Sequence, residues 1–397
     1  MKKEIILSLL FNIISILISL GFVSYLTKTL SVENFGNYQL VISFIGIVGI
    51  FSLSGLNMVL NRNILNGKDY IFNCLFYKNY KIVIKIFILL LLIVFLLKVL
   101  ITNEKLDLFL IALLFLPILG LDRYESVLYA KQKFIKIRIL SLVNVSLNVF
   151  LSILLFEYTH NYLWIFFSMY LVKSIVIYIG LKYVKILLEN SNDNNCTDEL
   201  KESHKLSLLS FYNIGIGQLD KLILGFMDIS SLAVYAVGIL IPLRVRDQIK
   251  LVASILVQKW AKGGKDYYAF QVKKYSVYIF TFNFLLATII SITAKFYIPL
   301  FFGTDYLDSI SIIWIMAYSM PFMINSYIYE AYIITFHNTT FFRKVTYSKQ
   351  VIYIVLLSIF VYYEYGIIGI SLAFLIRSLY TYIISYIYYI KYRKIDE

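Results

Sequence analysis

The sequence places acidic and basic residues inside stretches that are otherwise apolar. In the segment GQLDKLILG, from Gly217 to Gly225, Asp220 stands beside Lys221 between two uncharged runs. A charge at the centre of a bilayer costs at least ~2.5–3.5 kcal/mol, so it normally faces a polar partner or a water-filled cavity. Adjacent residues of a helix point about 100° apart. Asp220 and Lys221 are therefore not expected to form a simple pair, and each needs its own partner.

Basic residues outnumber acidic residues within the apolar stretches. Lys173, Arg244 and Arg377 fall near the middle of their stretches, which favours a role in a water-accessible cavity over structural pairing. Asp122, Arg123, Glu125, Lys250 and Glu330 lie closer to the ends, where long side chains can reach the interface, and there structural pairing is favoured. The remaining embedded charges are Lys85, Asp220, Lys221, Arg246 and Asp247. A basic cavity suits an anionic substrate.

Small and polar residues also recur at helical spacing. The rows are Ser8, Asn12, Ser15 and Ser19; Ser141, Asn144, Asn148 and Ser152; and Ser210, Asn213, Gly217 and Asp220, flanked by Gln218, Lys221 and Gly225. Such rows either pack helices or line a polar interior. The candidates for a substrate pathway are Lys173, Asp220, Lys221, Arg244, Arg246 and Arg377, with Asn12, Arg123, Asn144, Asn213, Gln218 and Glu330 as secondary candidates.

Motifs for enzymatic or metal chemistry are not found. Gly264-Lys265 lacks the earlier glycine of a nucleotide-binding loop, because Lys259 occupies that position. No zinc-binding HExxH, GxSxG elbow or metal-spaced carboxylates occur in the loops. Cys74 and Cys196 indicate neither a disulfide nor a metal site. We therefore expect no enzyme activity, catalytic residues, metal or cofactor.

The composition indicates a protein that crosses a membrane several times. Hydrophobic residues make up 60% of the 397 residues, and the mean hydropathy is +0.79. The net charge of +14 comes from residues scattered among short loops, so we expect no nucleic-acid partner. The apolar run 5–26 exceeds a signal-peptide core and lacks a cleavage site, which favours a retained first helix.

Twelve apolar stretches are long enough to cross a bilayer. We expect spans near 5–26, 38–60, 83–101, 107–129, 139–157, 163–182, 206–227, 231–256, 275–299, 308–334, 347–365 and 367–390. Most loop Lys and Arg residues fall in alternate loops, and the opposite loops hold only Lys28, Lys98, Lys105 and Lys295. This asymmetry places both termini in the cytoplasm. The predicted fold class is an all-α polytopic membrane protein with about twelve transmembrane helices.

The longest polar connection, 182–205, divides these spans into two sets of six. We expect an N-terminal lobe at 1–185, a cytoplasmic linker at 186–205 and a C-terminal lobe at 206–397. An even number of spans in each lobe predicts a pseudo-two-fold axis along the membrane normal. A faint internal echo, ENFGNY at 33–38 and SSLAVY at 230–235, is compatible with duplication but weak on its own.

Three segments together resemble a known family. LSVENFGNYQLVISF after the first span, QLDKLILGFMDISSLAVYAVG across the seventh and eighth, and LFFGTDYLDS after the ninth are similar to segments of Wzx-type polysaccharide repeat-unit flippases. These flippases belong to the multidrug/oligosaccharidyl-lipid/polysaccharide exporter superfamily. Ala233 stands where the family usually has glycine.

The resemblance implies two six-helix lobes around a central cavity that opens alternately to each side. It implies transfer of undecaprenyl-pyrophosphate-linked oligosaccharide to the outer leaflet of the bacterial inner membrane, for O-antigen or capsule. The implied partners are this lipid-linked substrate, membrane lipid, the polymerase and the chain-length regulator. Coupling to H⁺ or Na⁺ stays open, with Asp220 as the candidate carrier.

Other readings remain. A glycan polymerase or ligase usually carries essential Arg residues in a long outer loop, whereas the outer loops here are short and contain no Arg. A multidrug antiporter of the same superfamily would favour an acidic interior. A flippase for cell-wall lipid precursors is close in mechanism, and a purely structural membrane protein would not explain cations in the middle of spans.

Overall fold

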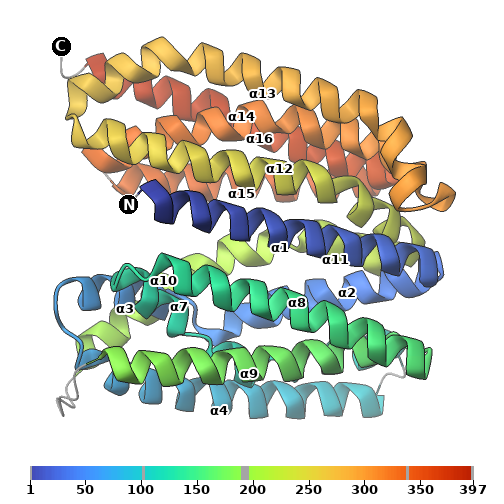
Figure 1. Cartoon of the computed structure of the whole chain (residues 1–397). Coiled ribbons are helices and arrows are strands. Elements are labelled where there is room, and N and C mark those ends of the chain that lie inside the picture. The colour runs from blue at the N-terminus through green and yellow to red at the C-terminus, as the bar shows by residue number, and fades with distance from the viewer. Residues whose placement is uncertain (1, 101–102, 189–195, 337–338, 395–397) are drawn as a thin grey trace. The chain divides into compact units, whose positions relative to one another are not determined.

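The computed structural model describes residues 2–100, 103–188, 196–336 and 339–394. Within these residues the chain forms α-helices and short 3₁₀ helices and contains no β-strand (Figure 1). The chain divides into two compact units, 1–222 and 223–397. The expected all-α fold class is therefore confirmed.

The N-terminal unit is built on helix pairs. Its α8 packs on both α1 and α9, and its α10 packs on α3. The elements are α1 (Lys2–Thr29), α2 (Val32–Val48), η1 (Gly49–Ser52), α3 (Gly55–Leu65), α4 (Ile71–Leu100), α5 (Glu104–Leu113), α6 (Leu116–Leu121), α7 (Tyr124–Ala130), α8 (Phe134–Thr159), α9 (Leu163–Leu187), α10 (Thr197–Ile216) and the start of α11 (Leu219–Met227).

The C-terminal unit surrounds one central helix. The helix α14 packs against α12, α13 and α16, and α15 packs mainly on α16. The elements are α12 (Ile229–Lys262), α13 (Lys265–Phe301), η2 (Thr304–Tyr306), α14 (Ser309–Phe336), α15 (Thr339–Tyr362) and α16 (Gly366–Lys394). Buried aromatic rings fill one end of this unit, including Trp260, Tyr268, Tyr329, Tyr332 and Tyr389.

Ten helices of the described chain are long and apolar enough to cross a membrane. The expected spans at 107–129 and 206–227 are not among them, because each is divided into shorter helices. Pro117 lies in the first turn of α6, where its missing N–H ends the preceding helix. Gly217 and Gln218 form the turn between α10 and α11. The second span is also divided, since Leu53 adopts a left-handed conformation between η1 and α3.

The boundary between the units differs from the one expected. The helix α10 packs on α3 and so belongs to the N-terminal unit, which extends to Leu222. Within the expected linker, 189–195 lie outside the described residues, and 197–205 are helical. Asp198 and Glu199 occupy the first turn of α10, where their negative charge favours helix formation.

The two segments of the internal echo have the same local structure. Ser31 caps α2 by accepting a hydrogen bond from the backbone N–H of Asn34. Asp228 caps α12 by accepting from the backbone N–H groups of Ser230 and Ser231. Four and seven residues after each cap the side chains are buried: Phe35 and Tyr38 in one segment, Leu232 and Tyr235 in the other. The same N-terminal capping arrangement, followed by the same two buried positions, therefore occurs in both units.

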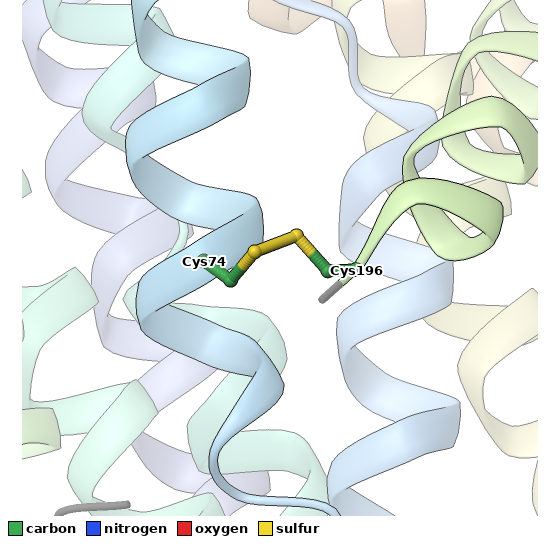
Figure 2. Close-up of a disulfide and its surroundings, with 2 residues drawn as sticks. All are labelled: Cys74 and Cys196. Carbon is green, nitrogen blue, oxygen red and sulfur yellow. A yellow bond between two sulfur atoms is a disulfide. The ribbon is translucent and has the colours of Figure 1, made fainter. Parts of the chain in front are cut away.

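The expectation that the cysteines are unpaired is wrong. Cys74 and Cys196 form a disulfide, with their Cα atoms 6.2 Å apart (Figure 2). The bond joins the first turns of α4 to the residue preceding α10. The two cysteines are separated by 122 residues, so their pairing depends on α10 packing beside α4 and leaves no local sequence signal.

Candidate functional site

Charged side chains from four helices gather within the C-terminal unit. We call this group the basic cluster: Lys250 of α12, Glu330 of α14, Lys349 of α15 and Arg377 of α16. The Lys349 ammonium is close enough to Glu330 to be attracted by it, and close enough to Arg377 and Lys250 to be repelled by both. The cluster therefore has more positive than negative charge.

Glu330 is the anchor of the basic cluster. It is 9% exposed, and its Oε1 accepts a hydrogen bond of 3.2 Å from the Ser385 hydroxyl of α16. The Lys349 Nζ lies 3.9 Å from the same oxygen. A buried carboxylate requires such partners to remain charged. Glu330 thereby ties α14 to both α15 and α16.

Two cations of the cluster lie over aromatic rings. The Arg377 guanidinium carbon is 4.6 Å from the centroid of the buried Tyr353 ring. The Lys250 Nζ is 5.2 Å from the centroid of Tyr327. A ring face stabilises a cation without neutralising its charge. Both side chains therefore bring positive charge beside aromatic rings in this part of the unit.

Arg244 and Arg246 follow a proline within α12. Pro242 cannot donate a backbone hydrogen bond, so the helix is weakened just before them. Arg244 is exposed. Arg246 Nη2 lies 2.7 Å from Asp247 Oδ1, and its Nη1 lies 3.8 Å from the Met323 sulfur.

In the N-terminal unit, Arg123 forms hydrogen bonds at the point where the helical backbone is interrupted after η1. It is 1% exposed, and its Nη1 donates to the side-chain oxygen of Asn57 at 3.2 Å. Its Nη2 donates to the carbonyl of Ser52, where η1 ends. Irregular backbone at membrane depth needs its polar groups satisfied by other parts of the protein. Arg123 supplies that partner.

The candidate Lys173 is engaged in an ion pair. Its Nζ lies 2.9 Å from Oδ2 of Asp122, the residue between α6 and α7. Glu125 is also close enough to Asp122 and Lys173 to feel both charges. The pair connects α9 to the divided fourth span. This geometry provides the structural partner that the sequence analysis considered as the lesser alternative for Lys173.

The side chains of Asp220 and Lys221 bond to different groups, in agreement with their angular spacing. Asp220 is 6% exposed, and its Oδ1 accepts from the backbone N–H of Lys221 at 2.9 Å. The Lys221 Nζ donates instead to the Gln218 side chain at 3.3 Å. Gln218 lies against Gly46 of α2, where an added Cβ would come within 3.2 Å of the amide. The turn between α10 and α11 thus packs against α2.

The polar rows are used differently from helix to helix. Asn148 accepts a hydrogen bond of 3.3 Å from Ser168, and Ser152 also bonds Ser168. This row of α8 therefore packs on α9. Asn12 and Asn144 are half-buried. The side chain of Asn213 lies outside the described residues.

The structure brings the basic cluster together from residues that the sequence separates. Glu330 and Arg377 are both sequence candidates, whereas Lys349 and Ser385 are not. Lys349 falls at the start of the expected span 347–365, which is the available signal for it. Among the described residues, no group of three His, Cys, Asp or Glu side chains is placed to hold a metal ion.

Comparison with protein families gives a match over residues 1–240, to the family described as polysaccharide biosynthesis protein. The chain belongs to this family. A search of curated protein sequences found no match.

Solved structures of transporters share the fold. A lipid II flippase, MurJ, in an inward closed conformation has a TM-score of 0.76 and 14% identity, covering 97% of this chain and 87% of its own. An inward-facing multidrug resistance MATE transporter of the MOP superfamily has a TM-score of 0.68 and 14% identity, covering 97% of both chains. The MATE transporter ClbM, in complex with Rb⁺, has a TM-score of 0.62 and 13% identity, covering 96% of this chain and 91% of its own.

The family match establishes the polysaccharide family, and the solved structures show that the chain shares the fold of these transporters. The ten apolar helices agree with these matches, and the chain is therefore a multi-pass membrane protein. At such low identities the likeness to solved structures establishes the fold alone. The roles of individual charged residues remain predictions.

Proposed function

We propose that this protein is a flippase of the Wzx type. It moves undecaprenyl-pyrophosphate-linked oligosaccharide repeat units from the cytoplasmic to the outer leaflet of the bacterial inner membrane, for O-antigen or capsule assembly. The proposal extends the family assignment, and the structural likeness to a lipid II flippase supports it. The single observation that carries it is the basic cluster, an excess of positive charge built into an apolar helical unit.

The chemistry of the substrate matches the cluster. A pyrophosphate carries negative charge and many acceptor oxygens, and charge-assisted hydrogen bonds from Lys and Arg suit it. Arg377 and Lys250 lie over aromatic rings. Glu330 fixes Lys349 at 3.9 Å and limits the local excess charge. In this proposal the cluster holds the pyrophosphate while the lipid tail remains in the bilayer.

Transport then requires a change of access to the bound headgroup. Alternating access exposes one site first to the cytoplasmic side and then to the outer side. The chain's own residues bind, release and shield the charged headgroup, and no covalent step is needed. In the cell we propose the polymerase and the chain-length regulator as partners that consume the translocated units.

The deciding experiment locates the lipid-linked single repeat unit in a strain lacking this protein. Spheroplasts are treated with a membrane-impermeant probe of the glycan. The expected result is loss of surface polymer and accumulation of single units that the probe cannot reach. Single units exposed on the outer face would show that flipping is intact, and the polymerase reading would replace the proposal.

A binding experiment tests the cluster directly with undecaprenyl pyrophosphate as the probe. The double variant Lys349→Gln/Arg377→Gln is expected to bind it at least about tenfold more weakly than the unaltered protein, since two charge-assisted contacts are lost. The control Lys259→Gln/Lys262→Gln removes the same charge from exposed positions at the end of α12 and should bind normally. If both variants bound undecaprenyl pyrophosphate with equal affinity, the basic cluster would not be part of the binding site.

A multidrug antiporter remains the second candidate, because MATE transporters share the fold. The buried Asp220 favours it, since a carboxylate can attract an organic cation. Efflux of ethidium from cells that express the protein separates the two readings. The flippase proposal predicts no change in ethidium efflux when the protein is removed.

A further inference from the structure

A pocket of about 290 Å³ lies on the N-terminal unit, between the start of α4 and the end of α9. Both helices pack against α6, and Leu121 of α6 lines the pocket between them. None of the residues proposed above to bind the transported substrate lines it.

The α4 wall of the pocket is aromatic. Phe72 is buried and stacks on Phe76 with ring centroids 5.3 Å apart. Tyr77 meets Phe76 edge to face at 5.6 Å and is 55% exposed. These rings fix one another, so they form a firm apolar surface rather than a set of independent side chains. An exposed tyrosine beside apolar rings is typical of a membrane interface.

The α9 wall places apolar and basic residues on one face. Tyr178, Leu181, Lys182 and Lys185 all line the pocket, and their spacing of three, four and seven residues puts them on one side of a helix. On the opposite side, an added Cβ at Gly180 would come within 2.5 Å of the Tyr124 ring. This close approach holds α9 against α7 and keeps the lysine-bearing face turned toward the pocket.

The pocket therefore has an apolar interior and a cationic rim. Lys182 and Lys185 are exposed, and no acidic side chain is among the described residues that line the pocket. The lysine stems can lie along apolar surface while their ammonium groups remain at the rim. The ligand that fits such a surface is an amphiphile with an anionic head.

We infer that this pocket binds an anionic phospholipid, with its phosphate at Lys182 and Lys185 and the start of one acyl chain against the aromatic wall. The volume accommodates only part of a lipid. The rest of the chain has a path along α4, where Ile88, Leu89 and Leu92 are 53–58% exposed. Ile88 lies about three turns beyond Tyr77 and so shares its face. Basic pockets beside apolar helices are a recurrent means of holding acidic lipid headgroups.

This inference does not depend on the proposed function, because the substrate-binding cluster lies in the C-terminal unit. The test uses the purified full-length protein and native mass spectrometry after exchange into equal amounts of phosphatidylglycerol and phosphatidylcholine. The unaltered protein is expected to retain phosphatidylglycerol at least about fivefold over phosphatidylcholine. The variant Lys182→Gln/Lys185→Gln is expected to lose this preference.

Two further variants and one competition experiment serve as controls. Lys201→Gln/Lys205→Gln removes the same charge from exposed positions of α10 outside the pocket and should keep the preference. Lys182→Arg/Lys185→Arg keeps the charge and should bind normally, which guards against misfolding of the glutamine variant. Inorganic phosphate should not displace the lipid. Retention of the preference by the Lys182→Gln/Lys185→Gln variant, equal loss of the preference in the α10 control, or displacement of the lipid by phosphate would overturn the inference.

Discussion

At the scale of single residues, the embedded charges fall into two groups according to what they contact. Arg123 and Lys173 in the N-terminal unit bond to groups at breaks in their own unit's helices. Arg377 and Lys250 in the C-terminal unit lie over aromatic rings. The first kind of contact satisfies backbone or carboxylate groups and so stabilises the fold, whereas a ring face stabilises a cation without neutralising its charge.

Arg123 should therefore be essential for stability. Arg123→Met leaves the Ser52 carbonyl and the Asn57 side chain without this donor, and we expect about 2–3 kcal/mol lower stability. The measurement is the melting temperature of the purified protein in detergent. Lys173→Met is the control, because the Lys173 side chain is 32% exposed and can be replaced by water. Equal losses in the two variants would contradict the assignment.

Asp220 is the candidate for carrying a coupling ion, on account of its burial within a transporter fold. Asp220→Asn keeps the shape and the acceptor oxygen for the Lys221 N–H but cannot bind and release a proton. We expect transport that no longer responds to an imposed proton or Na⁺ gradient, with folding unchanged. Normal gradient-driven transport by this variant would remove Asp220 from coupling.

Asp228 should make the start of α12 sensitive to acid. The hydrogen bond from the Ser231 hydroxyl, followed by the backbone N–H groups of Ser231 and Ser230, lowers the Asp228 pKa below its usual value. The folded pKa is the lower one, so the stabilisation is complete above the usual value of about 4 and is lost as the pH falls through the folded pKa.

The corresponding measurement compares melting temperatures from pH 7 toward about pH 3. Asp228→Asn preserves an acceptor oxygen at the cap and should melt almost normally at neutral pH. It should then lose less stability than the unaltered protein on acidification. Parallel curves for the two proteins would show that the cap carboxylate does not contribute to the pH dependence.

At the scale of elements, the N-terminal unit depends on close contacts at its divided spans. Gly55 begins α3, and an added Cβ would come within 2.3 Å of the Ser207 backbone nitrogen and 2.5 Å of the Ser203 carbonyl oxygen. The Gly55 N–H donates to the Ser207 hydroxyl at 3.0 Å. The helices α3 and α10 can therefore approach at this point only with glycine.

Gly55→Ala is expected to lower stability by roughly 1–3 kcal/mol, because the obstructing atoms belong to backbone and cannot rotate away. The matched control is Gly21→Ala in α1, where nothing lies within 4 Å of the added Cβ. That control should be neutral or gain roughly 0.5–1 kcal/mol from better helix propensity. Thermal melting of the two variants side by side gives the comparison, and similar values would contradict the close approach.

At the scale of the whole molecule, the Cys74–Cys196 disulfide connects distant parts of the N-terminal unit. A closed loop of this order restricts the unfolded chain by up to about 4–5 kcal/mol in the chain-entropy account, and less where the membrane already confines it. Both cysteines fall on the side that the sequence assigns to the cytoplasm, where thiols are usually kept reduced. The bond therefore makes stability dependent on redox state.

Reduction should lower the melting temperature of the unaltered protein but not that of Cys74→Ser/Cys196→Ser. The measurement is melting with and without a phosphine reductant, together with intact mass after alkylation under denaturing conditions. Each single serine variant should melt like the reduced protein. Alkylation of both cysteines in the untreated protein would show that the bond is absent.

The sequence by itself determines the features that depend on local patterns. Apolar runs of sufficient length specify membrane-crossing helices, because exposed backbone polar groups are too costly in lipid. The caps at Ser31 and Asp228 are local too, since a capping side chain reaches only two or three residues along the chain. The family resemblance rests on the same short segments.

The tertiary structure alone decides which distant residues meet. Glu330 and Ser385 are 55 residues apart, and the two cysteines 122, and no periodicity in the sequence links such positions. The same applies to Arg123, which is buried because it satisfies a carbonyl released where another span is divided. Hydropathy measures what each side chain costs in lipid, whereas helix packing determines which partner offsets that cost.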